Sequence, residues 1–247
     1  MNYRVILVSV MTLIMTSVFI LSVKPEAKAV EVSAESILIE NFQTSTTGQF
    51  PKGWGWLDGT SVKKINEAKP GEVPYVVMEE NGNKFLRADD KGQAITIVSD
   101  KKWNIKKYQC IQWRWRVNQF PTGANEYAKG KTDNAASLYI SYYVSFIGIP
   151  RSIKYIWSNT LPECETFRKD GTGKATNVVV ESGTSKTGQW ITETINIYEQ
   201  YKRVFGEYPP DEVAGIAIRT DADGTNSRAI ADYDDIIAIP YCDGPCK

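Results

Sequence analysis

Residues 108–117 read YQCIQWRWRV, and this stretch decides the fold class. In its second half, Trp113 and Trp115 alternate with Arg114 and Arg116. Successive side chains of a β-strand point to opposite faces, so the tryptophans would face a core and the arginines the outside. This alternation predicts a half-buried β-strand. Core packing is preferred to a sugar-stacking platform for the tryptophans, because aromatic side chains dominate core burial.

The same period of two recurs along the chain, with turn residues about every ten residues. The predicted strands are Ile37–Phe42, Tyr75–Met78, Phe85–Ala88, Ile95–Val98, Tyr108–Val117, Ala136–Val144, Ile153–Trp157, Asn177–Glu181, Trp190–Ile197, Gly215–Thr220 and Ala229–Ile239. One short helix is expected at Tyr198–Phe205, ahead of Gly206. Many short strands with one helix predict an all-β fold, a two-sheet antiparallel β-sandwich.

The first 29 residues have the three parts of a secretory signal peptide. A cationic start reaches Arg4, an apolar run covers Val5–Val23, and the small-residue site Ala27-Lys28-Ala29 follows. We therefore expect cleavage before Val30 and one domain over residues 30–247, secreted or periplasmic and free of the membrane after cleavage. The alternative is an uncleaved anchor, because the apolar run is long enough to span a bilayer.

Composition excludes several function classes. The chain has 29 basic and 29 acidic side chains, and it contains no histidine. Balanced charge provides no global field that would attract nucleic acid. Without histidine, Ser-His-Asp and Cys-His nucleophile systems and the usual catalytic zinc sites are excluded. Any catalysis would therefore have to use carboxylates, tyrosine, lysine, arginine or a bound hard cation.

Four cysteines follow the apolar run, and an even number in an exported chain favours disulfides over zinc ligation. Four cysteines allow three connectivities. We expect Cys242–Cys246 across the short Asp-Gly-Pro turn, which leaves Cys110–Cys164.

Residues on the outer strand faces and in turns are the candidates for ligand binding. Guanidinium groups and aromatic rings can hold a sugar ring or a uronate. The candidates are Arg114, Arg116, Tyr139, Tyr143, Arg219, Trp54, Trp56 and Trp157. The arginines and tyrosines are expected to form one exposed face, although an ordinary solvated sheet would show the same pattern. Each of the three tryptophans, which lie in or near turns, could equally belong to the core.

Several separated motifs share one order with a known family. They are Gln112–Val117, Tyr155–Asn159, Asn177–Gly183, Gly215–Asp223 and Asp234–Ile236. Together they resemble an exported bacterial domain-of-unknown-function family, number three-zero-four-seven, over about residues 37–239. Membership in this family implies no activity.

A second resemblance concerns architecture. Residues 40–42 (ENF) and residues 233–236 (YDDI) resemble the first and last strands of carbohydrate-binding jelly rolls of the concanavalin-like or galactose-binding-like type. The resemblance implies that these strands are neighbours and that Glu40 and Asp235 hold a structural calcium. Carboxylate oxygens are ligands that calcium prefers. The Asp- and Asn-containing stretch at residues 221–226 is expected to form a turn.

Three functions remain open. The leading hypothesis is a binding domain, without obvious catalytic machinery, for an extracellular or envelope polysaccharide. The runner-up is an enzyme. A polysaccharide lyase would use Tyr139 or Tyr143 with Arg114 or Arg116, and a glycoside hydrolase would use carboxylates such as Glu181. The third is a structural or assembly protein of the envelope.

The intact mass of the exported protein should match a chain that begins at Val30, within a residue or two. Mass spectrometry of protein from the periplasm or the medium measures this directly. Recovery of the full-length chain from the membrane fraction would show instead that the apolar run acts as an anchor.

Overall fold

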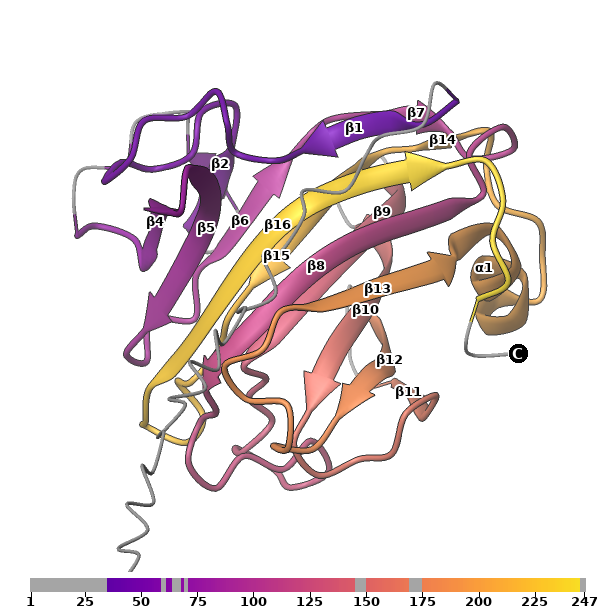
Figure 1. The fold of residues 1–247 in the computed structure, drawn as a ribbon. Helices are drawn as coiled ribbons and strands as arrows, with labels where there is room; N and C mark the ends of the chain where they lie inside the picture. The colour runs from indigo at the N-terminus through magenta and orange to yellow at the C-terminus, as the bar shows by residue number, and fades with distance from the viewer. Residues whose placement is uncertain are drawn as a thin grey trace, which may run out of the picture.

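The computed structural model describes residues 35–58, 61–63, 68, 71–144, 150–168 and 175–244. The expected signal peptide at residues 1–29 lies outside these ranges. Within them the chain forms two large packed β-sheets and one helix, so the predicted β-sandwich is confirmed (Figure 1). Nothing in these ranges is a helix with the length and apolar character that crossing a bilayer requires.

The first sheet is built around the last strand of the chain. Its strands are β1 (Ile37–Glu40), β4 (Tyr75–Glu80), β5 (Asn83–Asp90), β8 (Cys110–Gln119), β13 (Ile191–Asn196) and β16 (Ala229–Ile239). Their hydrogen-bonded order is β13-β8-β16-β5-β4, and β1 pairs with the end of β16 that β5 leaves free. The first and last strands are therefore neighbours, as the jelly-roll resemblance predicted.

The second sheet has eight strands in the order β11-β12-β10-β9-β15-β6-β2-β3. The strands are β2 (Gly55–Asp58), β3 (Ser61–Lys63), β6 (Thr96–Ser99), β9 (Ala136–Val144), β10 (Pro150–Ser158), β11 (Thr166–Arg168), β12 (Thr176–Ser182) and β15 (Gly215–Arg219). β10 and β12 pair in parallel, and the other pairs are antiparallel. β7 (Trp103–Asn104) and β14 (Glu212–Val213) form a separate small pair.

The helix α1 (Ile197–Phe205) lies where the sequence predicted it. The side chain of Asn196 accepts a hydrogen bond from a first-turn backbone N–H at 2.9 Å and caps the helix. Gly206 ends it in the left-handed conformation, with φ of 72°, which glycine adopts without steric cost. Buried Tyr201 packs its ring against Tyr142 of β9, with the ring centroids 4.7 Å apart.

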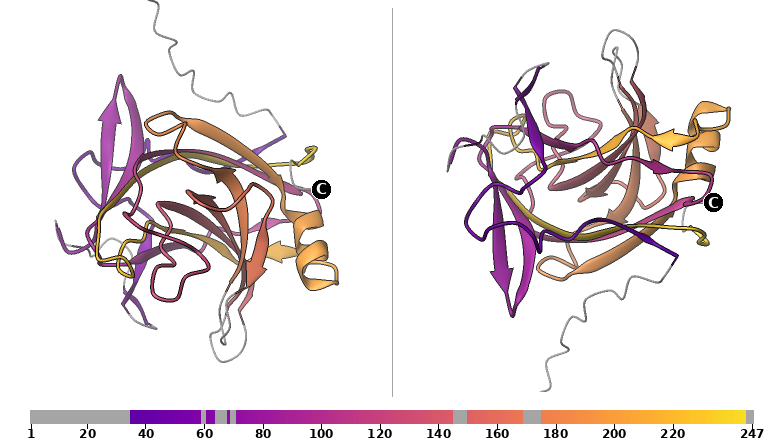
Figure 2. Two further views of the ribbon diagram at one scale, coloured as in Figure 1. Left: turned by 90° about the horizontal axis from the view of Figure 1, so that it is seen from below. Right: turned by 90° about the horizontal axis from the view of Figure 1, so that it is seen from above.

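Aromatic side chains of β8 and β10 join the two sheets. In Figure 1, β8 and β16 lie in front of β9 and β15, and Figure 2 shows the two layers from below and above. The ring of Trp113 lies 5.9 Å from that of Tyr155, and Trp115 lies 6.0 Å from Trp157. Trp113 and Trp115 also make an edge contact at 5.3 Å. All four side chains are buried, so the prediction that Trp113 and Trp115 belong to the core is confirmed.

Ion pairs cover the outer face of the first sheet. Arg114 of β8 contacts Asp234 and Asp235 of β16 at 2.6 and 2.9 Å. Arg116 contacts Asp232 at 2.8 Å. Because paired strands bring these arginines and aspartates side by side, each of these carboxylates lies next to a guanidinium group.

A β-bulge explains how two consecutive aspartates contact the same arginine. Neighbouring residues of a regular strand would point to opposite faces. The register of β16 against β8 shifts between Asp234 and Ile237, and Asp235 has a φ of 47°. Such a bulge re-aims a side chain, and here it brings both carboxylates to Arg114.

The expectation that Arg114 and Arg116 are exposed is wrong. Only 7% of the Arg114 side chain and 13% of the Arg116 side chain are exposed. Both guanidinium groups also lie 4.7 Å from the centroid of the Trp190 ring. Both guanidinium groups are therefore paired with carboxylates within the sheet and are largely withdrawn from solvent.

The predicted disulfide pairs are also wrong. Cys110 is bonded to Cys242, which lies 132 positions later in the sequence, and the two Cα atoms are 6.1 Å apart. Both Cys110–Cys164 and Cys242–Cys246 are therefore excluded. Cys164 is disulfide-bonded as well, and Cys246 lies outside the described residues. The sheet brings the beginning of β8 next to the end of β16, a neighbourhood that sequence spacing does not reveal.

Replacing Arg114 with Ala should lower the free energy of unfolding by about 3–5 kcal/mol, because two buried carboxylates lose their cation. The matched control is Arg228→Ala. Arg228 also pairs with an aspartate, Asp89, at 2.6 Å, but both side chains are substantially exposed, so the loss should stay below about 1 kcal/mol. Urea unfolding measures both values. Equal losses would contradict the described ion-pair layer.

Candidate functional site

The outer face of the second sheet carries an open groove. A hollow of about 390 Å³ is lined from β2, β6, β9, β10, β12 and β15. A second hollow of about 550 Å³ continues at the β2 end and shares Leu57, Thr96 and Arg219 with the first. We call the two together the sheet groove. Its principal polar and aromatic side chains are Tyr139, Lys154, Asn177, Arg219 and Asp221.

Small residues create the depth of the sheet groove. Ala217 of β15 lies opposite Tyr139 in the sheet register, and Ser141 and Ser152 lie opposite each other on β9 and β10. The two serine hydroxyls hydrogen-bond at 2.9 Å. Since the strands bring small side chains to the centre of the face, ring and long side chains around them become the walls.

Tyr139 and Lys154 stand side by side in this groove. They are cross-strand neighbours, and the ammonium of Lys154 lies 5.4 Å from the centroid of the Tyr139 ring. The Lys154 Nζ also donates to Asn134 Oδ1 at 2.7 Å. Burial lowers the pKa of Lys154 to about 8, although Asp221 opposes this shift.

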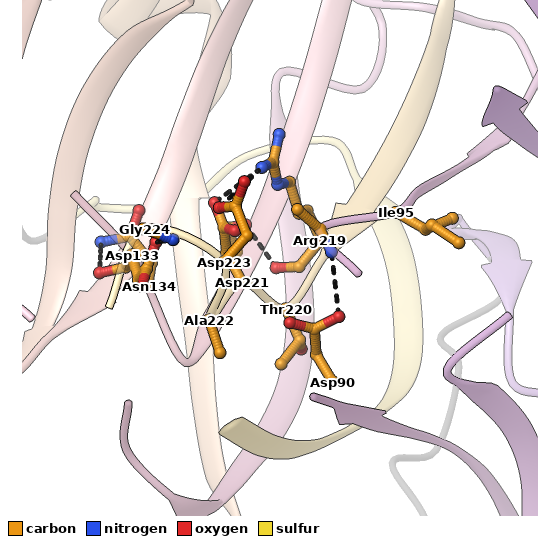
Figure 3. Close-up of polar contacts among 12 residues, drawn as sticks. Asp90, Ile95, Asp133, Asn134, Arg219, Thr220, Asp221, Ala222, Asp223 and Gly224 are labelled. Carbon is orange, nitrogen blue, oxygen red and sulfur yellow. Dashed lines mark hydrogen bonds and ion pairs between the residues drawn. The ribbon is translucent and has the colours of Figure 1, made fainter. Parts of the chain in front are cut away.

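An ion pair forms one end of the sheet groove. Arg219 is the last residue of β15, and its guanidinium group contacts Asp221 at 2.9 Å and Asp223 at 3.9 Å. Figure 3 shows the two carboxylates turned towards the Arg219 guanidinium. Burial alone would raise the pKa of Asp221, but Arg219 and Lys154 outweigh burial and the pKa is lowered. The pKa of Asp223 is raised by burial and by its neighbour Asp221.

A third carboxylate, Asp133, lies beside this pair. It accepts backbone hydrogen bonds from Gly224 at 3.1 Å and Thr225 at 2.7 Å. A Cβ at Gly224 would lie 2.9 Å from Asp133 Oδ1, so this close approach requires glycine. Oxygens of Asp133, Asp221 and Asp223 lie within 4.8 Å of one another, a set that could hold a metal ion. The stretch at residues 221–226 does form turns, as the sequence predicted.

The structure separates the residues that we expected on one Arg/Tyr face. Tyr139 and Arg219 lie in the sheet groove. Arg114 and Arg116 lie on the outer face of the other sheet, so the expected pairing of Tyr139 with either arginine is wrong. The side chain of Tyr143 lies outside what the structure describes.

The three candidate tryptophans have different surroundings. Trp54 and Trp157 are 1% and 0% exposed and belong to the core, so they cannot act as exposed ligand-binding rings. Trp56 is mostly buried but lines the second hollow of the sheet groove. Of the three, therefore, only Trp56 contributes to a described hollow on this face.

The two carboxylates proposed for calcium have separate partners. Glu40 accepts hydrogen bonds from the Phe42 backbone at 2.7 Å and from the Trp54 ring at 3.0 Å. Asp235 instead contacts Arg114. Calcium binding by Glu40 and Asp235 stays a prediction, and these contacts do not favour it.

Two groove residues were missed as candidates, although the sequence held their signal. In the predicted strands Ile153–Trp157 and Asn177–Glu181, the period of two already places Lys154 and Asn177 on outer faces. The structure pairs them across β10 and β12. Neither the pairing nor their shared groove with Tyr139 follows from the period.

A third residue that sequence reasoning missed is the buried acid Glu193. It lies between Ile191 and Ile195 at period two, which places it on an apolar face. Burial and, to a lesser extent, nearby Glu181 raise the pKa of Glu193 to about 7, although Trp115 donates a hydrogen bond to it at 3.2 Å. Glu181 itself contacts Lys186 at 2.6 Å.

The fold defines the class of protein, an all-β two-sheet sandwich. The chain belongs to the family described as "Protein of unknown function (DUF3047)", whose model matches residues 53–237. This confirms the resemblance that the separated motifs indicated. A search of curated proteins finds no match.

Several solved structures are similar in fold. One is the family 11 carbohydrate-binding module of the cellulosomal cellulase Lic26A-Cel5E of Clostridium thermocellum, with 12% identity, coverage of 85% of this chain and 97% of that chain, and a TM-score of 0.43. Another is a cellulase derived from Cel12A of Rhodothermus marinus, with 10% identity, coverage of 66% and 85%, and a TM-score of 0.40. A third is endoglucanase 3 from Trichoderma harzianum, with 11% identity, coverage of 66% of this chain and 81% of that chain, and a TM-score of 0.37.

Glu193→Gln should stabilise the protein at pH 8 by about 1–3 kcal/mol and leave it nearly unchanged at pH 4. The folded-state pKa is raised, so the wild type loses stability as the pH rises from the unfolded value through about 7. Glutamine stays neutral and can still accept from Trp115. Urea unfolding at both pH values measures the difference, and a gain that is independent of pH would contradict a buried titrating acid.

Proposed function

We propose that this protein is an exported, secreted or periplasmic, non-catalytic binding protein for a polysaccharide, and that the sheet groove is its binding site. The observation that carries the proposal is the open groove across one sheet, with Tyr139 among Lys154, Asn177 and Arg219. Sugar recognition needs an aromatic surface together with hydrogen-bonding groups of fixed orientation. The sheet groove combines both.

The dimensions of the groove support an extended ligand. The lining strands run from β12 to β2 through β10, β9, β15 and β6. Neighbouring strands lie about 4.8 Å apart, so the groove crosses roughly 24 Å of sheet. It is open rather than enclosed, which suits a polymer that enters and leaves at both ends better than a small metabolite.

The disulfides support the exported location. Disulfides persist in oxidising compartments and are rare in the cytosol of most organisms. Cys110–Cys242 joins the start of β8 to the segment that follows β16, and these two strands also carry the ion-pair layer of the first sheet. An oxidising destination therefore agrees with the signal peptide that the sequence predicts.

Tyr139→Ala should weaken polysaccharide binding at least about tenfold, which corresponds to about 1.4 kcal/mol. The matched control is Tyr208→Ala, which removes a tyrosine that is 70% exposed and lies outside the sheet groove. Affinity electrophoresis against bacterial and plant polysaccharides measures both, with circular dichroism to check folding.

The proposal would be contradicted if none of the polysaccharides slowed the migration of the wild-type protein in the gel. Equal losses in the two variants would move the binding site away from the sheet groove. Release of unsaturated, ultraviolet-absorbing products from a uronate polymer would assign the groove to the lyase alternative instead. Co-purification with a defined protein partner and no glycan would favour an envelope assembly role.

A further inference from the structure

The Arg219–Asp221 ion pair leaves part of its hydrogen-bonding capacity unused. Arg219 Nε and Asp221 Oδ1 are both buried and have no hydrogen-bond partner among the described residues. Both residues line the sheet groove, and their other atoms are joined at 2.9 Å. One unused donor and one unused acceptor therefore belong to a single charged pair at the groove.

A buried polar atom without a partner destabilises the folded state, because it has lost its hydrogen bonds to water without replacing them. A ligand that satisfies both atoms gains more than one that satisfies a single atom. A sugar hydroxyl both donates and accepts hydrogen bonds, so one or two hydroxyls can serve Arg219 Nε and Asp221 Oδ1 together. An ionised carboxylate only accepts, so it would serve Arg219 and leave Asp221 unsatisfied.

The charges around this end of the groove act in the same direction. Its cations are Lys154 and Arg219. The carboxylates that interact with them are Asp133, Asp221, Asp223 and Glu126. Lys154 and Arg219 are thus surrounded by more negative than positive groups, and an anionic ligand would meet net repulsion.

Building on the proposed function, we propose that the sheet groove binds an uncharged glycan through its hydroxyl groups and discriminates against uronate-containing polymers. Arg219 and Asp221 are the specificity-determining pair. Tyr139 supplies the ring surface, and the acids around the pair supply the discrimination.

The test uses polymers that differ only in charge. Polyuronides such as polygalacturonate and alginate are compared with their carboxyl-reduced forms, alongside uncharged plant and bacterial glycans. Isothermal titration of the mature protein should show binding to at least one uncharged polymer. Any polyuronide backbone that is bound should bind at least about tenfold more tightly in its reduced form. Affinity for the uncharged polymer should hardly change between low and high salt, because no ligand charge is screened.

Asp221→Asn tests the pair itself. The variant removes one carboxylate charge and should reduce the preference for reduced over charged polymers at least about threefold. The matched control is Asp89→Asn, which removes an aspartate paired with Arg228 on the other sheet and should leave the preference unchanged. Because the ratio of two affinities is measured in one sample, partial unfolding of a variant affects both affinities equally.

The outcomes separate this inference from the proposed function. Tighter binding of the charged polymers, or equal binding of the two forms, overturns the inference and keeps a polysaccharide-binding groove. An unchanged preference in Asp221→Asn removes Arg219–Asp221 as the pair that sets specificity. If the protein binds none of the polymers, charged or uncharged, both the proposed function and this inference are overturned.

Discussion

The contact between the aromatic side chains of β8 and β10 is the constraint on which both surfaces of the molecule depend. Trp113 and Trp115 meet Tyr155 and Trp157 between the sheets. Large rings at every second position fix which face of each strand is buried, because a shift by one residue would reverse every side chain. Once these rings are inside, the residues between them must lie outside.

The outward-facing residues of β8 and β10 differ in kind. On β8 the outward residues are arginines, and β16 supplies aspartates against them, so this surface is closed by its own ion pairs. On β10 the outward residues Ser152 and Lys154 face small or polar neighbours, and a groove remains. The same alternation therefore produces one surface that is covered by its own ion pairs and one that carries an open groove.

The period of two predicted the strands and the inward tryptophans, and the position of Gly206 predicted the end of the helix, because these features depend on neighbours in sequence. It could not tell which sheet a strand joins, so Arg114 and Tyr139 were placed on one surface although they lie on opposite sides of the sandwich. Strands of two to four residues, such as β7 and β11, are too short to show a period. The bulge at Asp235 and the Cys110–Cys242 bond depend on pairing between distant strands, which sequence spacing does not contain.

The central position of β16 has a consequence for synthesis. A ribosome releases the chain from its N-terminus, so β1, β5 and β8 emerge long before the strand that pairs with all three. Until residues 229–239 appear, these strands have unpaired edges, and the aspartate partners of Arg114 and Arg116 do not yet exist. Nascent chains should therefore remain open and susceptible to proteolysis or chaperone binding until residues 229–239 are available to pair.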